Sequence, residues 1–465
     1  MKIKRLKMQS FRGIGDLTLD FDEIEPTVLI GINGVGKSTI LDCLAILLSQ
    51  VTGQIQDSLD ALRFFSNLDV MNGRDRTKNT ITVLLDFQEL TWSLSDGQST
   101  NNIDANPFNL EAYIQEISEL EIKVRSKLKN YTESKSLLLQ IENLRKRIET
   151  EIRSKLVEDL KTVLEKLKHQ LETIPNANIP LAVYYPVNRA VIDMPLEISE
   201  ASSFKQVDAY EQSLKGGRID FKKFFEWFRN REDLENEKRR DSPNYRDKHL
   251  EAVRQAIVLL IPDFSNLRVE RSPLRMTVKK QGEELIVNQL SDGEKCLLAM
   301  VGDLARRLAI ANPGLSEPLQ GSGVILIDEI ELHLHPKWQR EIITALTRTF
   351  PNCQFIVTTH SPQVISHVKP EGIYILEKTD NGVIAKRPES SFGRDSNRIL
   401  EDLMDVPERP QEIKTSLLEL FRLIDAGNLE GARKLRQELA AEIGADEPEF
   451  VRADVLIRRK EILNR

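Results

Sequence analysis

The sequence predicts an α/β protein built on a parallel β-sheet, and three stretches of the chain carry that prediction. The apolar run TVLI at residues 27–30 enters the glycine-rich loop GINGVGKST, and the segment ILDCLAILLS that follows has the apolar density of a buried helix. Two further apolar runs, GVILIDEI at 323–330 and NCQFIVTTH at 352–360, flank a segment of helical character. Buried strands that alternate with helices are typical of a parallel sheet covered on both faces.

Composition and charge limit the classes of protein to which the chain can belong. A length of 465 residues is enough for about two to four structural units. Hydrophobic residues make up 40% and charged residues 29%, which favours a large buried core. The net charge of −7 excludes a uniformly basic surface for nucleic acid. The three cysteines, Cys43, Cys296 and Cys353, form no CxxC pair, so we expect buried thiols in a reducing cytosol.

Neither a signal peptide nor a membrane span is expected. The N-terminal segment MKIKRLKMQSFRGIG lacks the apolar core that a signal peptide carries. No stretch approaches the roughly 20 apolar residues that a membrane-spanning helix needs. The sequence therefore predicts a cytoplasmic protein with no membrane partner.

Changes in sequence pattern divide the chain into five predicted segments. Apolar residues between 114 and 174 recur at gaps of three and four, with Lys, Glu and Arg between them, which predicts a helical hairpin or coiled coil. An ordinary helical insertion packed on the body of the protein is the alternative. The segments are an N-terminal lobe (1–109), the helical insertion (110–178), the rest of the first lobe with a helical lobe (179–289), a C-terminal lobe (290–380) and a helical tail (381–465).

A complete phosphate-binding pattern, GxxxxGK[ST], lies at residues 31–38 between the first buried strand and its helix. Glycines let backbone N–H groups converge on phosphates at the helix N-terminus. Lys37 supplies a positive charge to the β- and γ-phosphates, and the Ser38 hydroxyl can bind Mg²⁺. The pattern predicts an ATP site with Mg²⁺ as cofactor, formed by Asn33, Gly34, Val35, Gly36, Lys37, Ser38 and Thr39.

An acidic motif, VILIDE at residues 324–329, complements this loop. Its four apolar residues predict a central buried strand, and Asp328 at the end of the strand can hold the Mg²⁺ shell. Glu329 beside it is placed to polarise the attacking water as a general base. An acidic pair at a strand end can also cap a helix, and it is the combination with the glycine loop that favours catalysis.

The stretch LSDGEK at residues 290–295 is a second candidate anion site. A Ser-x-Gly at a helix N-terminus offers backbone N–H groups to an anion, whereas Ser followed three residues later by Glu also forms a capping box. The stretch resembles the signature sequence of ABC-type ATPases, in which the serine and glycine contact the γ-phosphate bound by the opposite subunit. That resemblance assigns Ser291, Gly293 and Glu294 to the ATP site of a neighbouring copy, and it implies a homo-oligomer of at least two chains.

A histidine after the last buried strand fits the same superfamily. His360 in TTHS resembles the switch histidine of ABC-type ATPases, where a neutral imidazole can sense the γ-phosphate and position the attacking water. A single histidine at a strand end is usually structural, so its place after Asp328 and Glu329 carries the prediction. Glu329 and His360 are the predicted catalytic residues.

The start of the chain favours the RecF/SMC/OLD branch of these ATPases over the transporter branch. LKMQSFRGIGDLTLDF at residues 6–21 is similar to the opening strand-turn-strand of that branch, and the resemblance implies that Arg12 of FRG reaches the nucleotide. It also implies an ABC-type P-loop ATPase head with an antiparallel β subdomain, a helical lobe, inserted helices and a helical C-terminal tail. The glutamine loop, which would add a ligand for Mg²⁺, is either at Gln88 in DFQEL or in the segment YYPVNR at 184–189.

Three further stretches resemble the PtuA ATPases of Septu anti-phage systems and of certain retrons: FFEWFRNREDLENE, HLHP and the tail from residue 396. The resemblance covers nearly the whole chain. It implies a regulatory ATPase that works beside a separately encoded, PtuB-like HNH nuclease, and in retrons beside a reverse transcriptase. The six histidines form no HNH constellation and the tail has no DxD, so we expect no nuclease site in this chain.

Two rival functions stay open from the sequence. One is a RecF-like ATPase of DNA repair or replication, and the other is a nucleotide-stabilised scaffold with negligible turnover. We expect DNA to be contacted mainly by the complex of this chain with its nuclease partner, and less by this chain directly. The basic clusters at residues 236–240 and 125–130 favour solvated helix faces at this net charge, although they could touch phosphates.

Overall fold

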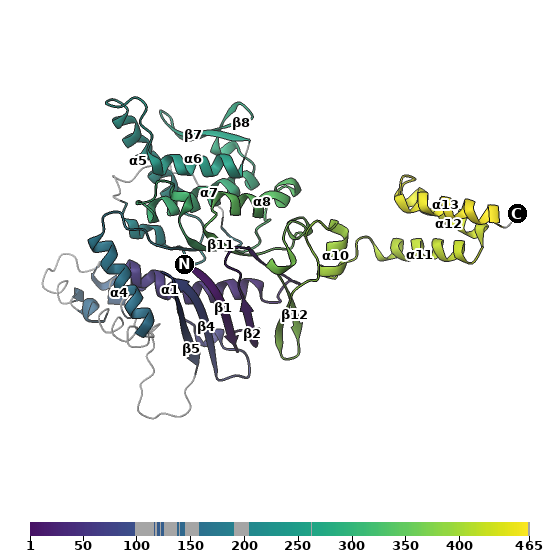
Figure 1. The fold of residues 1–465 in the computed structure, drawn as a ribbon, viewed down its shortest axis with the longest axis horizontal. Helices are drawn as coiled ribbons and strands as arrows, with labels where there is room; N and C mark the ends of the chain where they lie inside the picture. The colour runs from purple at the N-terminus through teal and green to yellow at the C-terminus, as the bar shows by residue number, and fades with distance from the viewer. Residues whose placement is uncertain are drawn as a thin grey trace. The chain divides into compact units, whose positions relative to one another are not determined.

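The computed structural model divides the chain into two compact units, residues 1–393 and 394–465 (Figure 1). The first unit carries every predicted site residue, and the second is the helical tail. The residues that the structure describes are 1–97, 158–189, 204–261 and 263–463, together with 116, 119–120, 122–124, 137–138 and 140–144.

The core of the first unit is a six-stranded sheet in the order β13-β12-β3-β11-β10-β6. Five strands, β12, β3, β11, β10 and β6, pair in parallel, and β13 joins β12 as an antiparallel hairpin. Every residue of β3, β6, β10 and β11 is buried, as expected for strands covered on both faces. The predicted α/β class is confirmed. The strands are β3 (Thr27–Ile30), β6 (Leu181–Tyr185), β10 (Gly323–Ile327), β11 (Cys353–Thr358), β12 (Ile373–Thr379) and β13 (Gly382–Lys386).

Helix α1, Lys37–Gln56, lies between this sheet and a second, antiparallel sheet. It contacts β6, β10 and β11 of the core sheet and β4 of the antiparallel sheet. The indole N–H of Trp92 in β5 donates to the carbonyl of Leu47 in α1 at 3.1 Å. Among the described helices, α1 is long and apolar enough to cross a membrane, but 83% of that stretch is buried within the protein, as in the core helix of a globular domain.

The antiparallel sheet has the order β2-β1-β4-β5 and forms the predicted β subdomain. Leu6 and Met8 of β1 alternate with exposed residues, and Ile3 is buried on the other side of a register shift between Ile3 and Arg5. The N-terminal strands therefore belong to the same unit as the core sheet. The strands are β1 (Lys2–Gln9), β2 (Asp16–Asp20), β4 (Arg76–Leu85) and β5 (Gln88–Gly97).

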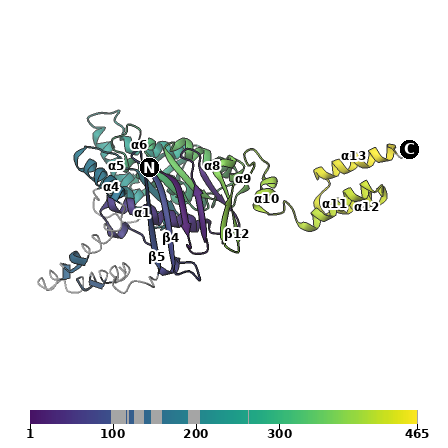
Figure 2. The ribbon, with the colours of Figure 1, turned by 60° about the horizontal axis from the view of Figure 1, so that its bottom comes forward.

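The described parts of the predicted helical insertion pack on the body of this lobe. Helix α4, Glu158–Thr173, contacts α1 and β5, and it lies beside α1 in both views of the ribbon (Figure 1, Figure 2). Leu120 and Ile141 form a small buried cluster with Leu62 of the first lobe. These contacts favour the packed insertion over a free coiled coil. The rest of the amphipathic run, including residues 145–157, lies outside the described residues.

A helical lobe with a small sheet leads into the signature segment. Helices α5 and α6 pack on α7, and the sheet order is β7-β8-β9. Aromatic side chains of α5, including Phe224, Trp227 and Phe228, are buried in this lobe. Strand β9 ends shortly before α7, so the lobe presents the N-terminus of α7. The elements are α5 (Phe221–Lys238), α6 (Lys248–Leu260), β7 (Phe264–Arg271), β8 (Leu274–Lys280), β9 (Glu283–Ile286) and α7 (Asp292–Ala311).

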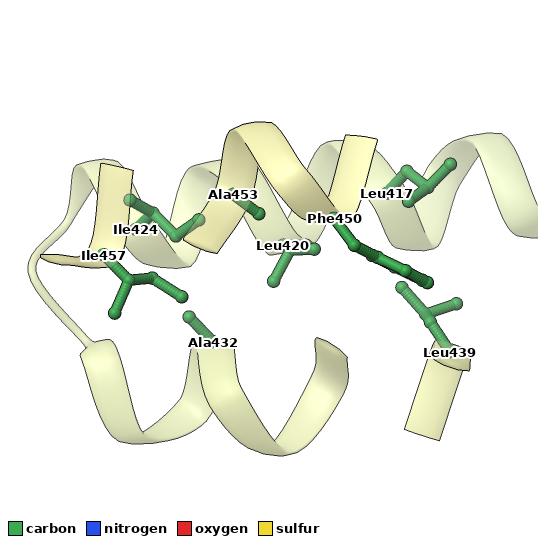
Figure 3. Packing of buried hydrophobic residues seen from close by; sticks show 8 residues of the cluster. All are labelled: Leu417, Leu420, Ile424, Ala432, Leu439, Phe450, Ala453 and Ile457. Carbon is green, nitrogen blue, oxygen red and sulfur yellow. The ribbon is translucent and has the colours of Figure 1, made fainter. Parts of the chain in front are cut away.

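The tail has a hydrophobic core of its own, made by α11, α12 and α13 (Figure 3). We predicted that the tail starts at residue 381, whereas the second unit starts at residue 394, because β13 pairs with β12 in the core sheet. The buried cluster contains Leu417, Leu420, Ile424, Ala432, Leu439, Phe450, Ala453 and Ile457. The helices of this unit are α10 (Ser396–Met404), α11 (Gln411–Asp425), α12 (Leu429–Ile443) and α13 (Pro448–Leu463).

Candidate nucleotide-binding site

The glycine-rich loop connects the C-terminal end of β3 to the first turn of α1. Gly36 is the N-cap residue of α1, with a φ of 113° that L side chains rarely adopt. A Cβ at this position would also lie 2.3 Å from Cδ1 of Ile14. Both the backbone angle and the close approach therefore require glycine, and they hold the loop in a conformation with its N–H groups at the helix N-terminus. Ser38 is exposed in the first turn of α1.

Lys37 connects this loop to the acidic end of β10. Its Nζ donates to the carbonyl oxygens of Gly31 and Ile32, at 2.9 and 3.1 Å. Burial lowers the pKa of Lys37, and three carboxylates near the end of β10 oppose that shift. An ammonium has three donors, so a donor remains for a phosphate oxygen when two carbonyls are bound. The carboxylates are those of Asp328, Glu329 and Glu331.

Asp328 and Glu329 are held against β11 by the hydroxyl of Thr358. Thr358 Oγ1 donates to Asp328 Oδ1 at 2.6 Å and accepts from the backbone N–H of Glu329 at 2.7 Å. Glu329 has a φ of 46°, a left-handed conformation that costs a non-glycine residue about 1–3 kcal/mol. Surrounding bonds must therefore maintain it. Thr358 supplies two of them, and it was not among the residues predicted from the sequence.

Arg189 holds the same segment from the side of β6. Its side chain is only 2% exposed, and its guanidinium donates to the carbonyl oxygens of Asp328 and of Glu329, the latter at 2.8 Å. A third bond, of 3.3 Å, reaches the carbonyl of Pro186. Arg189 belongs to the segment YYPVNR, which we considered as a glutamine loop. One feature of the sequence could have pointed to Arg189: it follows shortly after the apolar strand β6, whose five residues are all buried.

His360 lies at the end of β11, and Glu331 binds its backbone. The N–H of His360 donates to Glu331 Oε1 at 2.5 Å. Glu331 Oε2 is buried and has no hydrogen-bond partner among the described residues, so it can accept from a bound water or approach a cation. Burial lowers the pKa of His360, and the charge of Lys37 lowers it further. This direction favours the neutral imidazole, the form that the predicted switch histidine needs, although Glu331, Glu329 and Asp328 oppose the shift.

The segment LSDGEK at residues 290–295, called the signature segment here, forms the capping box that was its alternative interpretation. Ser291 is the N-cap of α7, its Oγ lies 2.8 Å from Glu294 Oε2, and it accepts from the Glu294 N–H at 3.4 Å. Glu294 also pairs with Lys280 of β8 at 2.6 Å. A Cβ at Gly293 would lie 2.1 Å from the carbonyl oxygen of His333, so α7 packs directly on the loop after β10. Within the described chain, no hydrogen bond joins Ser291 to the glycine loop.

Arg12 and Gln88, the remaining predicted site residues, lie in the first lobe. The guanidinium of Arg12 binds Asp42 of α1 at 2.7 Å and Asp69 at 2.8 Å, which places it beside the helix that the glycine loop precedes. Gln88 is exposed and pairs with Leu85 at the turn between β4 and β5. Among the described residues, no hydrogen bond joins Gln88 to the glycine loop. The role of each stays a prediction.

The described basic cluster, 236–240, is bound mostly to its own lobe. Arg239 pairs with Glu235 at 2.9 Å and donates to the carbonyl of Tyr245 at 3.1 Å. A cavity of about 770 Å³ beside it is lined by arginines that include Arg239 after α5, Arg254 of α6 and Arg271 of β7. Two buried glutamates, Glu232 and Glu235, bind these three arginines. These pairs favour a structural role for the cluster. The second cluster, 125–130, lies outside the described residues.

Known proteins are similar to this chain along most of its length. It is 29% identical to "Retron Ec83 probable ATPase" of Escherichia coli, over 99% of this chain and 87% of that protein. It is 28% identical to "Retron Vc95 probable ATPase" of Vibrio cholerae serotype O1 biovar El Tor, over 91% of this chain and 82% of that protein. "Septu protein PtuA" of Bacillus thuringiensis is 28% identical over 35% of this chain and 43% of its own length. The predicted resemblance to retron and Septu ATPases is confirmed.

Solved structures include SMC heads with loose overall similarity. The SMC head domain from Thermotoga maritima covers 84% of this chain and 100% of its own, at 14% identity and a TM-score of 0.38. An SmcHead bound to the C-winged helix domain of ScpA covers 83% of this chain and 98% of its own, at 13% identity and a TM-score of 0.40.

A protein-family profile covers the ATPase core. The profile described as "AAA domain, putative AbiEii toxin, Type IV TA system" matches residues 27–366. That range includes the glycine loop, the signature segment, the acidic end of β10 and His360. Since the match spans well over half of the chain's 465 residues, this protein belongs to that AAA-domain family.

Proposed function

We propose that this chain is the ATP-binding and ATP-hydrolysing regulatory subunit of a bacterial anti-phage defence complex. The observation that carries the ATPase part is the convergence of three segments at one end of the core sheet. Lys37 of the glycine loop lies within the electrostatic reach of Asp328 and Glu329, and His360 lies within reach of the same charges. These residue types in this arrangement are suited to phosphoryl transfer from ATP to water.

The described residues fit ATP with Mg²⁺. Ser38 and Asp328 would hold the cation, which neutralises charge on the phosphates when bound. Lys37 would donate to a phosphate oxygen beyond the two carbonyls it already binds. Glu329 would accept a proton from the attacking water while the water oxygen forms a bond to the γ-phosphorus and the bond between that phosphorus and ADP breaks. Neutral His360 would orient that water or donate to the γ-phosphate.

Ser291 supports a site completed by a second copy. In its own chain the Ser291 hydroxyl donates to Glu294, and it would exchange that acceptor for a phosphate oxygen of the partner's nucleotide. A helix N-terminus capped by serine attracts anions, so the start of α7 could meet the γ-phosphate held by a partner. Two chains enclosing two ATP molecules would then form the active state, and hydrolysis would release them.

The defence part of the proposal rests on the relatives named as retron ATPases and as Septu PtuA. By analogy, the ATPase cycle would control a separately encoded, PtuB-like HNH nuclease, and a reverse transcriptase in a retron setting. Contact with DNA would come through that complex. A RecF-like repair ATPase and a nucleotide-stabilised scaffold are the competing functions. A measurable rate of ATP turnover would argue against the scaffold. A neighbouring HNH reading frame would favour the defence function over the repair factor.

Complementation between two inactive variants tests the shared site. K37A should not bind ATP but keeps its own Ser291, while S291R keeps its glycine loop but blocks the partner's site. Each variant alone should hydrolyse ATP at least about 100-fold more slowly than wild type. A mixture should recover activity, because S291R supplies the glycine loop and K37A supplies the serine. A mixture no faster than the sum of its parts contradicts the shared site.

The partner is tested by co-expression with the product of a neighbouring HNH frame, followed by purification and a nuclease assay with and without ATP. E329Q is the matched variant, because it should bind ATP yet lose turnover about 100-fold or more. A stable complex whose cleavage responds to ATP and changes in E329Q supports the regulatory role. A chain that hydrolyses ATP but binds no HNH protein supports the repair alternative.

A further inference from the structure

We infer that Arg189 is a positioning residue for ATP hydrolysis: it fixes the backbone of Asp328 and Glu329, and so aims the Glu329 carboxylate at the attacking water. This inference rests on the proposed ATPase function. It goes beyond that function by naming a residue to which the proposed mechanism gives no contact with nucleotide or metal. Arg189 acts through another residue, so it is not a catalytic residue itself.

The bonding of Arg189 is unusual for a buried arginine. Its guanidinium binds three backbone carbonyls, those of Pro186, Asp328 and Glu329. Among the described residues, no carboxylate forms an ion pair with it. Two of these bonds run from its two terminal nitrogens to the carbonyls of successive residues, Asp328 and Glu329. The position therefore favours a cation with two parallel N–H donors in one plane, which arginine alone supplies.

The backbone that Arg189 holds is strained. Glu329 has a φ of 46°, and its carbonyl accepts from Leu332 at 3.0 Å as well as from Arg189. On the other side, Thr358 accepts the N–H of Glu329. The peptide groups on both sides of Glu329 are thus fixed, one by Arg189, which follows β6, and one by Thr358 of β11. Without Arg189, the segment can relax toward an ordinary φ, which rotates the Cα–Cβ bond of Glu329 away from its present direction.

Arg189 also lies next to α7, the helix that begins in the signature segment. Burial raises the pKa of the Cys296 thiol in the second turn of α7, and the charge and hydrogen bonding of Arg189 oppose that shift. Arg189 therefore lies near α7 while it binds the acidic end of β10. A displacement of α7 when its N-terminus meets a phosphate would be felt at the carbonyls of Asp328 and Glu329.

The competing interpretation is that Arg189 only stabilises the fold, and Arg306 provides the matched control. Arg306 is also an arginine buried near the core, only 4% exposed, and it pairs with Asp303 of the same helix at 2.8 Å. It makes no described hydrogen bond to the acidic end of β10. If the loss of any buried arginine lowers stability, substitutions at both positions should do so. If Arg189 positions Glu329, only substitutions at Arg189 should also lower the rate of ATP turnover.

The experiment compares R189M and R189K with R306M and R306K in the full-length chain. Methionine keeps much of the volume without donors, and lysine keeps the charge without the planar pair of donors. For each variant, kcat and KM for ATP are measured with the melting temperature, with and without a non-hydrolysable ATP analogue. The increase in melting temperature caused by the analogue reports nucleotide binding by the folded protein.

We expect both Arg189 variants to lower kcat about 100-fold while changing the affinity for the ATP analogue less than about threefold. The Arg306 variants should lower the melting temperature with kcat within about twofold of wild type. An Arg189 variant with normal kcat overturns the inference. So does a loss of analogue binding that parallels the loss of rate, because Arg189 would then support the fold or the nucleotide and not Glu329.

The double variant R189M/E329Q supplies a readout that a structural role would not give. If Arg189 acts through Glu329, the double variant should retain the same residual rate as E329Q, because the positioned group is already removed. Independent, multiplicative losses overturn the inference. The proposed function fails separately: E329Q with wild-type turnover contradicts catalysis by Glu329, whereas an inactive E329Q beside a fully active R189M contradicts only the role of Arg189.

Discussion

Glu331 Oε1 accepts a hydrogen bond from the backbone N–H of His360, with 2.5 Å between the two atoms. The two residues are 29 positions apart in sequence, and the bond joins the segment after β10 to the segment after β11. His360 is thereby fixed relative to the segment that carries Glu329. A movement of either segment must be shared by the other or must break this bond.

Removing the carboxylate of Glu331 should slow ATP turnover without preventing nucleotide binding. E331A leaves the partly buried N–H of His360 without its acceptor, and we expect kcat to fall about tenfold, equivalent to about 1.4 kcal/mol. Affinity for ATP should stay near that of wild type, because Lys37 and the glycine loop are intact. E331Q keeps one oxygen acceptor and should remain within about threefold of wild type. Steady-state kinetics check this, and equal losses in both variants would point to the charge instead of the hydrogen bond.

Adding one methyl group at Gly293 should displace the signature helix. The new Cβ would lie 2.1 Å from the carbonyl oxygen of His333, so α7 or the loop after β10 must move. We expect G293A to lose about 1–3 kcal/mol of unfolding free energy and to weaken ATP-dependent assembly. G217A is the control, since an added Cβ there meets no atom within 4 Å. Chemical denaturation and light scattering with ATP measure the two effects. Wild-type stability in G293A would contradict the tight packing at His333.

The stability of the protein should decrease on acidification because of His249. Burial lowers the pKa of His249 from 6.5 to about 4, and the charge of Arg231 lowers it further. Between those values the unfolded chain binds a proton that the folded chain does not, so stability that is present above pH 6.5 is lost as the pH falls toward about 4. H249Q should reduce this pH dependence. Urea unfolding across that range tests the prediction, and identical pH profiles for both proteins would rule out His249 as the source.

The tail should lose its structure without affecting the ATPase unit when Phe450 is truncated. Phe450 is fully buried among the cluster of α11, α12 and α13 (Figure 3). F450A should lower the stability of the tail by about 3–5 kcal/mol, as expected for a large buried aromatic residue. Turnover of ATP should remain close to wild type, because this core is separate from that of residues 1–393.

The control for the tail is V451A. Val451 is 64% exposed, so its truncation should leave the tail intact. Hydrogen exchange of the tail amides and limited proteolysis report local unfolding, while ATP hydrolysis reports the first unit. A cooperative loss of both units in F450A would contradict the independence of the two cores.

Local sequence patterns determined the nucleotide loop and the acidic end of β10. The pattern at residues 31–38 specifies its own conformation, because glycine spacing, the preceding strand and the following helix are all neighbours in the chain. The position of Asp328 and Glu329 after a fully buried strand is local in the same sense. The prediction for His360 likewise depended on its local position directly after the buried strand β11. The capping box at Ser291 was visible as an alternative, and the structure contains it.

Only the tertiary structure decided which residues hold that site in place. Arg189 and Asp328 are 139 positions apart, and they meet because β6 pairs with β10 in register. Thr358 reaches Asp328 because β11 pairs with β10 on the other side. A backbone carbonyl or N–H carries no sequence signature, so partners that bind the backbone of distant residues cannot be read from a motif. The order of the parallel strands, which depends on non-local pairing, therefore determined which residues support the candidate site, while the chain's local motifs predicted which residues would carry its chemistry.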